Sequence, residues 1–303
     1  MKTYGNPESL SAAPNQVQYE TSDEGRIAWI TLNRPEKHNA LSVPMRARIS
    51  QLVHEAEADP QVRVVVFRGN GKSFCSGNEI NEKWGQRKPG DRRMSLTTAY
   101  RYATDMVWGR QGFSQSISRC TKITVMQLHG FCAAAAYFMF AMKVDMVLVG
   151  EGAKVGALEA RFLGPASAVA SIHINRILGT RAARRSGYTA EAFTGPEAVR
   201  LGLAHECVPD GELPARTLAI AQEMAARPAH QVRYRKARVL AGEGIFDTAV
   251  PAMTGLLFSH FLQAETDESH FWTDVRKSGI GGALDADKAR RAAIDAQVKG
   301  EPT

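Results

Sequence analysis

The stretch VRVVVFRGNGKSFCSGNEI, residues 62–80, opens with a continuous β-branched run and closes on a glycine-bearing loop. A run of this kind, without polar alternation, is typical of a strand that is buried on both faces. Gly-Asn-Gly at 69–71 ends the strand, because this tripeptide favours a turn. The segment ITVMQLHG, residues 123–130, has the same character and predicts a second buried strand.

The neighbouring segments supply the other elements of an α/β fold. RIAWITLNRP (26–35) predicts a strand that runs into a turn, and VDMVLVGEGAKVG (144–156) predicts a strand, a turn and a short strand. We expect helices at 97–119, in the alanine-rich stretch after Gly130, and at 41–59, where the apolar residues at helical spacing are Met45, Ile49, Leu52, Val53 and Ala56. Strands that alternate with helices at this spacing indicate right-handed crossovers.

The chain divides into three predicted regions. Residues 1–15 are polar and are expected to form a flexible lead-in. Residues 16–208 form the α/β core. From 209 to 303 the patterns are helical, with almost no strand signal, so we expect a separate helical region there.

Composition narrows the class of protein. Of the 303 residues, 44% are apolar and 23% are charged, as in ordinary globular proteins. No apolar run approaches the roughly 20 residues of a membrane helix, and the N-terminus lacks the pattern of a signal peptide, so we expect a cytoplasmic protein without a membrane partner. The net charge of +7 comes from scattered basic residues, which favours an anionic small molecule over nucleic acid. The cysteines have no metal-ligand spacing and are expected to be reduced core thiols: Cys75, Cys120, Cys132 and Cys207.

The order of the segments carries a resemblance to a known family. The segments are ITLNRPEKHNAL (30–41), RVVVFRGNGKSFCSGNEI (63–80), ITVMQLHGFCAAAAYFMFAMKVDMVLV (123–149), GAKVGALEARFLG (152–164) and FTGPEAVRLGLAHECVP (193–209). From residue 25 to about 210 the chain resembles the crotonase (enoyl-CoA hydratase/isomerase) superfamily, and the helical tail to 303 fits as well. The resemblance implies a spiral of ββα units, followed by C-terminal helices that build a homotrimer or hexamer.

The resemblance also implies the chemistry. Family members bind acyl-CoA thioesters, or occasionally related carbonyl compounds free of CoA, and the thioester is a substrate, so no separate cofactor or metal is expected. Two backbone N–H groups stabilise the substrate's enolate oxygen. The family's first donor falls on Asn78, directly after Gly77, and the second falls on Ala135 at the start of a helix.

The carboxylates of the family are only partly present. The family hydratase carries its first carboxylate three residues after the second donor, where this chain has Phe138. Residues 129–145 form a stretch one residue longer than is usual in the family, and alignment from its far end moves the position to Met139. Neither side chain can titrate. The second family carboxylate matches Glu159, in GALEA, although the turn that follows it departs from the family pattern.

Three functions remain open at this point. One carboxylate suffices to move a proton from C2 to C4 of a 3-enoyl thioester, which favours an isomerase over a hydratase. The chain also resembles the CoA-independent branch that hydrolyses cyclic β-diketones (6-oxocamphor hydrolase-like), in which a histidine activates water; the possible histidines are His38, His129 and His173. The third possibility is a non-catalytic member that acts as a binding subunit.

Binding of CoA would separate the first two functions. In the family the adenine lies against the first donor's loop, here residues 76–80 with Ser76 and Ile80 at its ends. Lys37 and Lys72 lie on segments that resemble those near the phosphates. A C-terminal phenylalanine followed by basic residues also reaches this site in the family, and the corresponding residues here are Phe271, Arg276 and Lys277.

Overall fold

A computed structural model describes three long segments of the chain, residues 15–79, 113–158 and 171–242. It also describes residues 274, 277–279, 281–283, 285–286, 288–290 and 292. The chain separates into two compact units, residues 1–217 and residues 218–303. The first unit contains all the strands given below.

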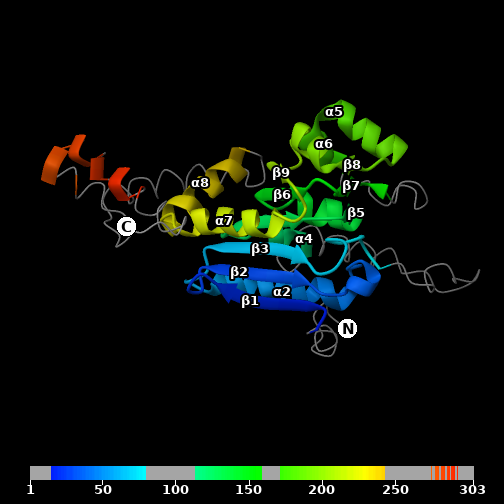
Figure 1. Ribbon diagram of the computed structural model, residues 1–303, viewed down its shortest axis with the longest axis horizontal. Helices are drawn as coiled ribbons and strands as arrows, with labels where there is room; N and C mark the ends of the chain where they lie inside the picture. Colours follow the sequence, from blue (N-terminus) through cyan, green and yellow to red (C-terminus); the bar gives the residue numbers. More distant parts are fainter. Residues whose placement is uncertain are drawn as a thin grey trace, which may run out of the picture. The chain divides into compact units, whose positions relative to one another are not determined.

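A six-stranded sheet forms the centre of the first unit, with the strand order β1-β2-β3-β4-β6-β9 (Figure 1). Its strands are β1 (Val17–Ser22), β2 (Ile27–Leu32), β3 (Val64–Gly69), β4 (Ile123–Leu128), β6 (Met146–Gly150) and β9 (Glu206–Val208). β1 is antiparallel to β2, and every later neighbour pair is parallel. The parallel register pairs Val64 of β3 with Ile27 on one side and Ile123 on the other. The two stretches predicted to be buried strands are therefore adjacent in the sheet, and the α/β class is confirmed.

The structure describes a second, smaller sheet. It has the order β5-β7-β8, with β5 at Phe131–Ala133, β7 at Lys154–Gly156 and β8 at Phe193–Thr194. The prediction of a strand, a turn and a short strand over 144–156 corresponds to β6 and β7 and is confirmed.

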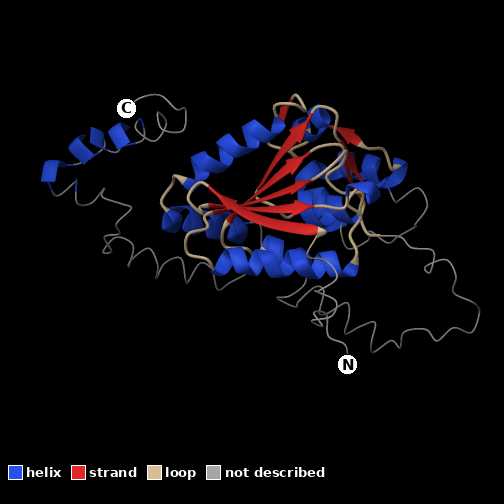
Figure 2. Cartoon of the chain, turned by 60° about the horizontal axis from the view of Figure 1, so that its bottom comes forward, coloured by secondary structure: helices blue, strands red, loops and turns tan. Residues whose placement is uncertain are grey.

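Helices connect the strands of the first unit. They are a 3-10 turn at Pro35–Lys37, α2 (Val43–Ala58), α4 (Phe113–Ser118), the π turn η3 (Tyr137–Ala141), α5 (Ser171–Thr189) and α6 (Gly195–Arg200). α2 begins where the Ser42 hydroxyl accepts from the Met45 N–H, and it packs beside β1 and β2 (Figure 2). Its predicted apolar face is confirmed, because Met45, Ile49, Leu52, Val53 and Ala56 are all fully buried.

An aromatic cluster ties β3 to the elements that follow it. The Phe140 ring of η3 meets the Phe67 ring of β3 edge-on, at a centroid distance of 5.4 Å. It meets the Phe74 ring of the loop after β3 at 5.1 Å. All three rings are buried. Since aromatic rings prefer this edge-to-face geometry, the cluster holds the loop and the π turn in register with the sheet.

The alanine-rich stretch differs from the prediction of a continuous helix. Phe131–Ala133 is strand β5, Ala134 has φ +53°, and the helical turn begins only at Ala135. Alanine favours helices, but pairing of β5 with β7 and with Cys75 outweighs this local preference. The helix predicted at 97–119 is described only in part: α4 and Arg119 belong to the described residues, and residues 97–112 lie outside them.

Beyond β9 every element that the structure describes is helical. α7 (Leu213–Ala225) crosses the boundary between the units, and α8 (Ala229–Gly242) lies within the second. No helix in the described segments is long and apolar enough to span a bilayer. The predicted role of residues 209–303 in oligomerisation stays a prediction.

Candidate active site

The first candidate donor is the N–H of Asn78, on the loop after β3. The extended backbone there lies beside Leu41. Leu41 donates its N–H to the Gly77 carbonyl at 2.7 Å, and Glu79 donates its N–H to the Leu41 carbonyl at 3.0 Å. These two bonds make Asn78 the centre of a parallel bridge. Because successive backbone groups of an extended chain point to opposite sides, the N–H of Asn78 is directed away from Leu41.

The second candidate donor is the N–H of Ala135. This residue follows β5, and β5 pairs with Cys75 of the loop after β3. Cys75 donates to the Phe131 carbonyl at 2.9 Å, and Ala133 donates to the Cys75 carbonyl at 3.1 Å. Ala134 then adopts left-handed backbone and donates to the Gly156 carbonyl at 3.1 Å. This conformation turns the chain from β5 into the helical turn that begins at Ala135.

Gly77 brings the two donor segments into contact. A Cβ atom on Gly77 would lie 2.8 Å from the Ala134 Cβ and 3.3 Å from the Ala135 nitrogen. Gly77 also has φ +110°, which side chains rarely adopt. In the part of the chain that the structure describes, no acceptor takes the N–H of Asn78 or that of Ala135. Two unpaired donors on adjacent segments form a candidate oxyanion hole.

Arginines hold the side chains on the first donor's loop. Arg46 of α2 donates from Nη1 to the Asn78 side-chain oxygen at 3.2 Å. Arg34 donates from Nη2 to Glu79 Oε1 at 2.7 Å. The hydrogen bond from Arg34 holds the pKa of the Glu79 carboxyl below its usual value, and Glu79 raises the pKa of Arg34 in return. Sequence reasoning missed both arginines, because nothing in their spacing indicates contact with a loop more than 30 residues away.

Phe138 and Met139 are the two residues that the resemblance aligns with the family's first carboxylate, and both are apolar. Phe138 lies in the π turn, is half-buried, and packs against the Tyr137 ring at a centroid distance of 5.0 Å. A π turn uses one more residue than an α turn, and so it can absorb the extra residue of this stretch. Met139 lies in the same turn. Glu159, the predicted second carboxylate, lies outside the described residues.

Two of the candidate histidines, His38 and His129, have hydrogen-bond partners among the described residues. His38 is exposed, and its Nδ1 lies 3.1 Å from the Ser73 hydroxyl. Its carbonyl accepts from the Ser76 N–H at 2.9 Å, so its backbone is next to the first donor's loop. Nε2 of His129 lies 2.9 Å from the Gly71 carbonyl oxygen. His173 lies on α5.

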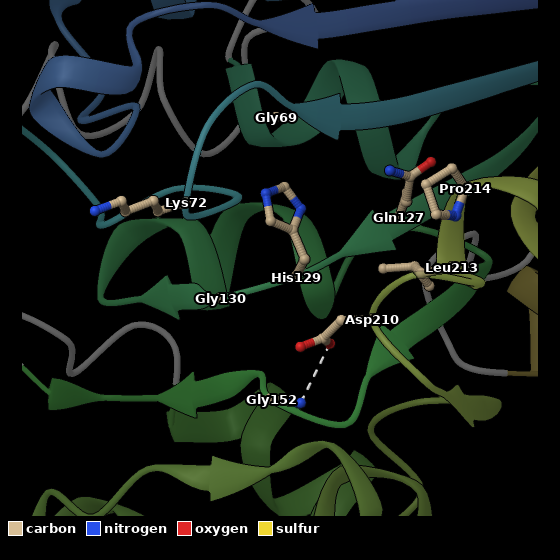
Figure 3. A pocket seen from close by; sticks show the side chains of 9 residues that line it. All are labelled: Gly69, Lys72, Gln127, His129, Gly130, Gly152, Asp210, Leu213 and Pro214. Atoms are coloured by element: carbon tan, nitrogen blue, oxygen red, sulfur yellow. Dashed lines mark hydrogen bonds between the residues drawn. The ribbon is translucent and has the colours of Figure 1, made fainter.

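Only some of the residues predicted to contact CoA lie among the described residues. Lys37 is exposed at the end of the 3-10 turn, and Ser76 is half-buried on the first donor's loop. Lys72 is exposed and lines a pocket at the carboxyl edge of the large sheet, and neither Asn78 nor Ala135 lines that pocket (Figure 3). Lys277 is exposed and belongs to the second unit. The remaining predicted contacts lie outside the described residues: Ile80, Phe271 and Arg276.

The cysteines are free thiols, as predicted, and three of them are buried. Burial raises the pKa of the Cys75 thiol to about 12, although the Gly77 backbone partly offsets this effect. Burial also raises the pKa of Cys132, with a further contribution from Cys75. The thiols of Cys75 and Cys132 are therefore protonated and unreactive at neutral pH.

Known proteins resemble this chain in sequence and in structure. The sequence profile described as "Enoyl-CoA hydratase/isomerase" matches residues 22–269. A "Putative enoyl-CoA hydratase" of Thermus thermophilus is 28% identical over 74% of this chain and 84% of its own length. A "Probable enoyl-CoA hydratase 1, peroxisomal" of Arabidopsis thaliana is 27% identical over 86% of this chain and 88% of its own. A crystal structure of enoyl-CoA hydratase from Mycobacterium smegmatis has a TM-score of 0.64 at 29% identity, and the match covers 91% of this chain and 92% of that one.

Proposed function

Because the chain belongs to the enoyl-CoA hydratase/isomerase family, we propose that it shifts the double bond of a 3-enoyl-CoA thioester into conjugation. In this proposal Glu159 removes a proton from C2 and delivers it to C4. The N–H groups of Asn78 and Ala135 donate to the thioester oxygen as it becomes an enolate. Electrostatic stabilisation of this kind supplies a large part of the rate enhancement in enzymes that form an oxyanion.

Phe138 is the observation that carries the proposal. Hydration needs a group that activates water and a group that delivers a proton at the α-carbon, and two carboxylates share this work in the family hydratase. Phe138 is half-buried, and its side chain has no group that can exchange a proton. Proton transfer within one substrate needs only a single carboxylate.

Glu79 is the other acid on the first donor's loop, and its environment makes it a poor replacement for the missing carboxylate. Arg34 pairs with it at 2.7 Å and lowers its pKa, so Glu79 is ionised at neutral pH. A carboxylate that is held ionised by an arginine is a weak proton donor. The ion pair therefore favours a structural role for Glu79.

Hydration is the second candidate function, and the printed names of the relatives from Thermus thermophilus and Arabidopsis thaliana favour it. It requires a second proton-transfer group close to the thioester. In the family this group is the carboxylate whose position the resemblance assigns to Phe138 or Met139. The two functions therefore differ in a property that can be measured, which is the number of titrating groups that turnover requires.

Replacing Glu159 by Gln tests the proposed acid–base role. This change keeps the shape of the side chain and removes the base, so kcat should fall by roughly 10²–10⁴-fold with little change in thioester affinity. Glu79→Gln is the matched control and should retain most of the activity. Near-normal turnover by Glu159→Gln would show that another residue moves the proton. Absence of any melting shift with millimolar acetoacetyl-CoA would remove the CoA-dependent proposal altogether.

A further inference from the structure

The loop after β3 and strand β5 pair as parallel strands only as far as Ala133. Cys75 donates its N–H to the Phe131 carbonyl at 2.9 Å, and Ala133 donates its N–H to the Cys75 carbonyl at 3.1 Å. These two bonds form one repeat of a parallel ladder. In the next repeat Gly77 would donate to the Ala133 carbonyl, and Ala135 would donate to the Gly77 carbonyl. A continued ladder would therefore consume the N–H of Ala135, which is the second candidate donor.

Neither bond of this next repeat is present, although the structure describes all of its residues. The Gly77 N–H lies 3.4 Å from the sulfur of Cys75 instead. The Gly77 carbonyl accepts from the Leu41 N–H at 2.7 Å. A carbonyl oxygen has two lone pairs, so the bond from Leu41 does not by itself exclude a second bond from Ala135. Another feature must keep the Ala135 N–H out of the ladder.

The backbone of Ala134 is this feature. Ala134 lies between the last paired residue of β5 and the second donor, and its φ of +53° is left-handed. An extended residue here would continue the strand, whereas a left-handed one turns the chain away from the loop. Both backbone groups of Ala134 are bonded in this conformation: its N–H donates to the Gly156 carbonyl at 3.1 Å, and its carbonyl accepts from the Phe138 N–H at 3.2 Å. These two bonds hold a conformation that alanine disfavours.

We propose that Ala134 is a positioning residue, whose left-handed backbone ends the ladder and leaves the Ala135 N–H free to donate to an enolate oxygen. This role rests on the proposed function in that it requires an enolate at the site, but it does not require Glu159 to move the proton. It depends on the conformation of Ala134 and not on its methyl group. Substitutions that test it must therefore differ in their tolerance of left-handed backbone.

Asparagine and threonine form a matched pair of substitutions for Ala134. The two side chains are similar in volume and both are polar, but asparagine adopts left-handed backbone far more readily than β-branched threonine. In Ala134→Thr we expect the backbone to shift toward the extended conformation, which brings the Ala135 N–H toward the Gly77 carbonyl. Ala134→Asn should leave the donor free. Ala134→Gly should do so as well, because glycine adopts this conformation without cost.

Ionisation of bound acetoacetyl-CoA measures the action of the donor. This β-keto thioester loses a proton from C2 to give an enolate that absorbs in the near ultraviolet, and donors at the enolate oxygen increase the acidity of the ligand. Absorbance titration against pH with saturating protein gives its acid dissociation constant. We expect this constant to fall by about tenfold or more in Ala134→Thr, and to stay within about twofold in Ala134→Asn and Ala134→Gly. The kcat for a 3-enoyl-CoA should follow the same order, with little change in KM.

Glu24→Thr is the control for backbone strain. Glu24 is mostly exposed, has φ +57°, and lies in the turn before β2, at the opposite edge of the large sheet from the loop after β3. Threonine there is forced into the same disfavoured conformation, so the melting temperature should fall while the acidity of the bound ligand and kcat stay unchanged. Equal losses of acidity in Glu24→Thr and Ala134→Thr would contradict a specific role for Ala134.

Three other results would overturn this role. The first is equal acidity of bound acetoacetyl-CoA in folded Ala134→Thr and Ala134→Asn. The second is an unmodified protein that leaves the acidity of this ligand unchanged, since no free donor would then act on its enolate. The third needs no variant, and so it stands even where threonine prevents folding: in the unmodified protein, the Ala135 amide hydrogen would exchange with solvent as slowly as that of Ala133, which is bonded to Cys75.

Failure of the proposed function gives a different pattern. The unmodified protein would then increase the acidity of bound acetoacetyl-CoA, lose this effect in Ala134→Thr, and yet leave the double bond of a 3-enoyl-CoA in place. That pattern would remove isomerisation and confirm the role of Ala134.

Discussion

Arg46 and Asn78 are joined by a hydrogen bond of 3.2 Å from the guanidinium to the side-chain oxygen, although 32 residues separate them in the sequence. The bond connects helix α2, whose apolar face is fully buried, with the loop that carries the first candidate donor. Fixing the Asn78 side chain restricts rotation of its backbone, and hence the direction of its N–H group. Arg46 is therefore a positioning residue for the candidate oxyanion hole.

Replacing Arg46 by Met should lower kcat with little change in KM. The hydrogen bond fixes the direction of the Asn78 N–H. Its loss should therefore weaken stabilisation of the enolate more than binding of the thioester. We expect a fall of roughly three- to tenfold, equivalent to about 0.7–1.4 kcal/mol. Steady-state kinetics with one substrate give both constants. Arg46→Lys should recover part of the loss, because it keeps a cationic donor.

Arg48→Met is the control for this change. Arg48 lies on the same helix, but it pairs with Glu55 at 3.6 Å. Its replacement should leave kcat unchanged. Equal losses in the two variants would show that α2, and not the bond to Asn78, sets the rate.

Gly77→Ala should both destabilise the protein and lower its activity. The new Cβ would lie 2.8 Å from the Ala134 Cβ and 3.0 Å from the Ala133 carbonyl oxygen, in a backbone with φ +110°. A residue held in such a conformation costs about 1–3 kcal/mol, and relief of the contact moves Ala135 away from the loop. Denaturant unfolding measures the first effect and turnover measures the second.

Gly211→Ala provides the matched comparison, because a Cβ atom there meets nothing within 4 Å. Its free energy of unfolding should change by no more than about 0.5 kcal/mol. A Gly77→Ala protein as stable and as active as Gly211→Ala would contradict the close approach of the two donor segments.

The ion pair between Arg34 and Glu79 should make a pH-dependent contribution to stability. The pKa of Glu79 in the folded protein lies below its usual value of 4.5, chiefly because Arg34 donates to it. The stabilisation is therefore fully present above pH 4.5. It is lost as the pH falls through the lower pKa that Glu79 has in the folded protein. Since Glu79 is about one-third exposed, at 32%, the contribution is at most about 1 kcal/mol.

Thermal unfolding of Glu79→Gln at several pH values measures this contribution. The unmodified protein should be more stable than the variant near pH 7, and the difference should shrink below pH 4.5. Glu36→Gln, which removes a mostly exposed carboxylate 3.7 Å from the same arginine, should show little difference at any pH. A constant gap between the unmodified protein and Glu79→Gln down to pH 3 would contradict the lowered pKa.

The parts of the fold that follow from local patterns could be predicted from the sequence. The continuous β-branched runs of β3 and β4 and the helical spacing of the buried face of α2 are local signals, and all three elements are present. β1 was not predicted, since Val17 is its one fully buried residue and the strand lies at the edge of the sheet. Edge strands bury little apolar surface and so carry a weak signal.

The geometry of the candidate site could be predicted only in part. The loop residue Asn78 and the helix start at Ala135 could be located, because the resemblance aligns them residue by residue. The left-handed backbone of Ala134 could not, since alanine has no local preference for it and contacts with neighbouring strands impose it. The bond from Arg46 was also missed, because it depends on how α2 packs beside the loop.

The most direct measurement follows isomerisation and hydration with a single preparation of the protein. Formation of the conjugated 2-enoyl thioester from a 3-enoyl-CoA raises the absorbance, and hydration of crotonyl-CoA lowers it. With Phe138 and Met139 as the alternatives for the position of the missing carboxylate, isomerisation should be the faster reaction by at least tenfold, and Glu159→Gln should slow it by roughly 10²–10⁴-fold. Rapid hydration of crotonyl-CoA by the unmodified protein, at a rate equal to or above that of isomerisation, would contradict the proposed single-carboxylate mechanism.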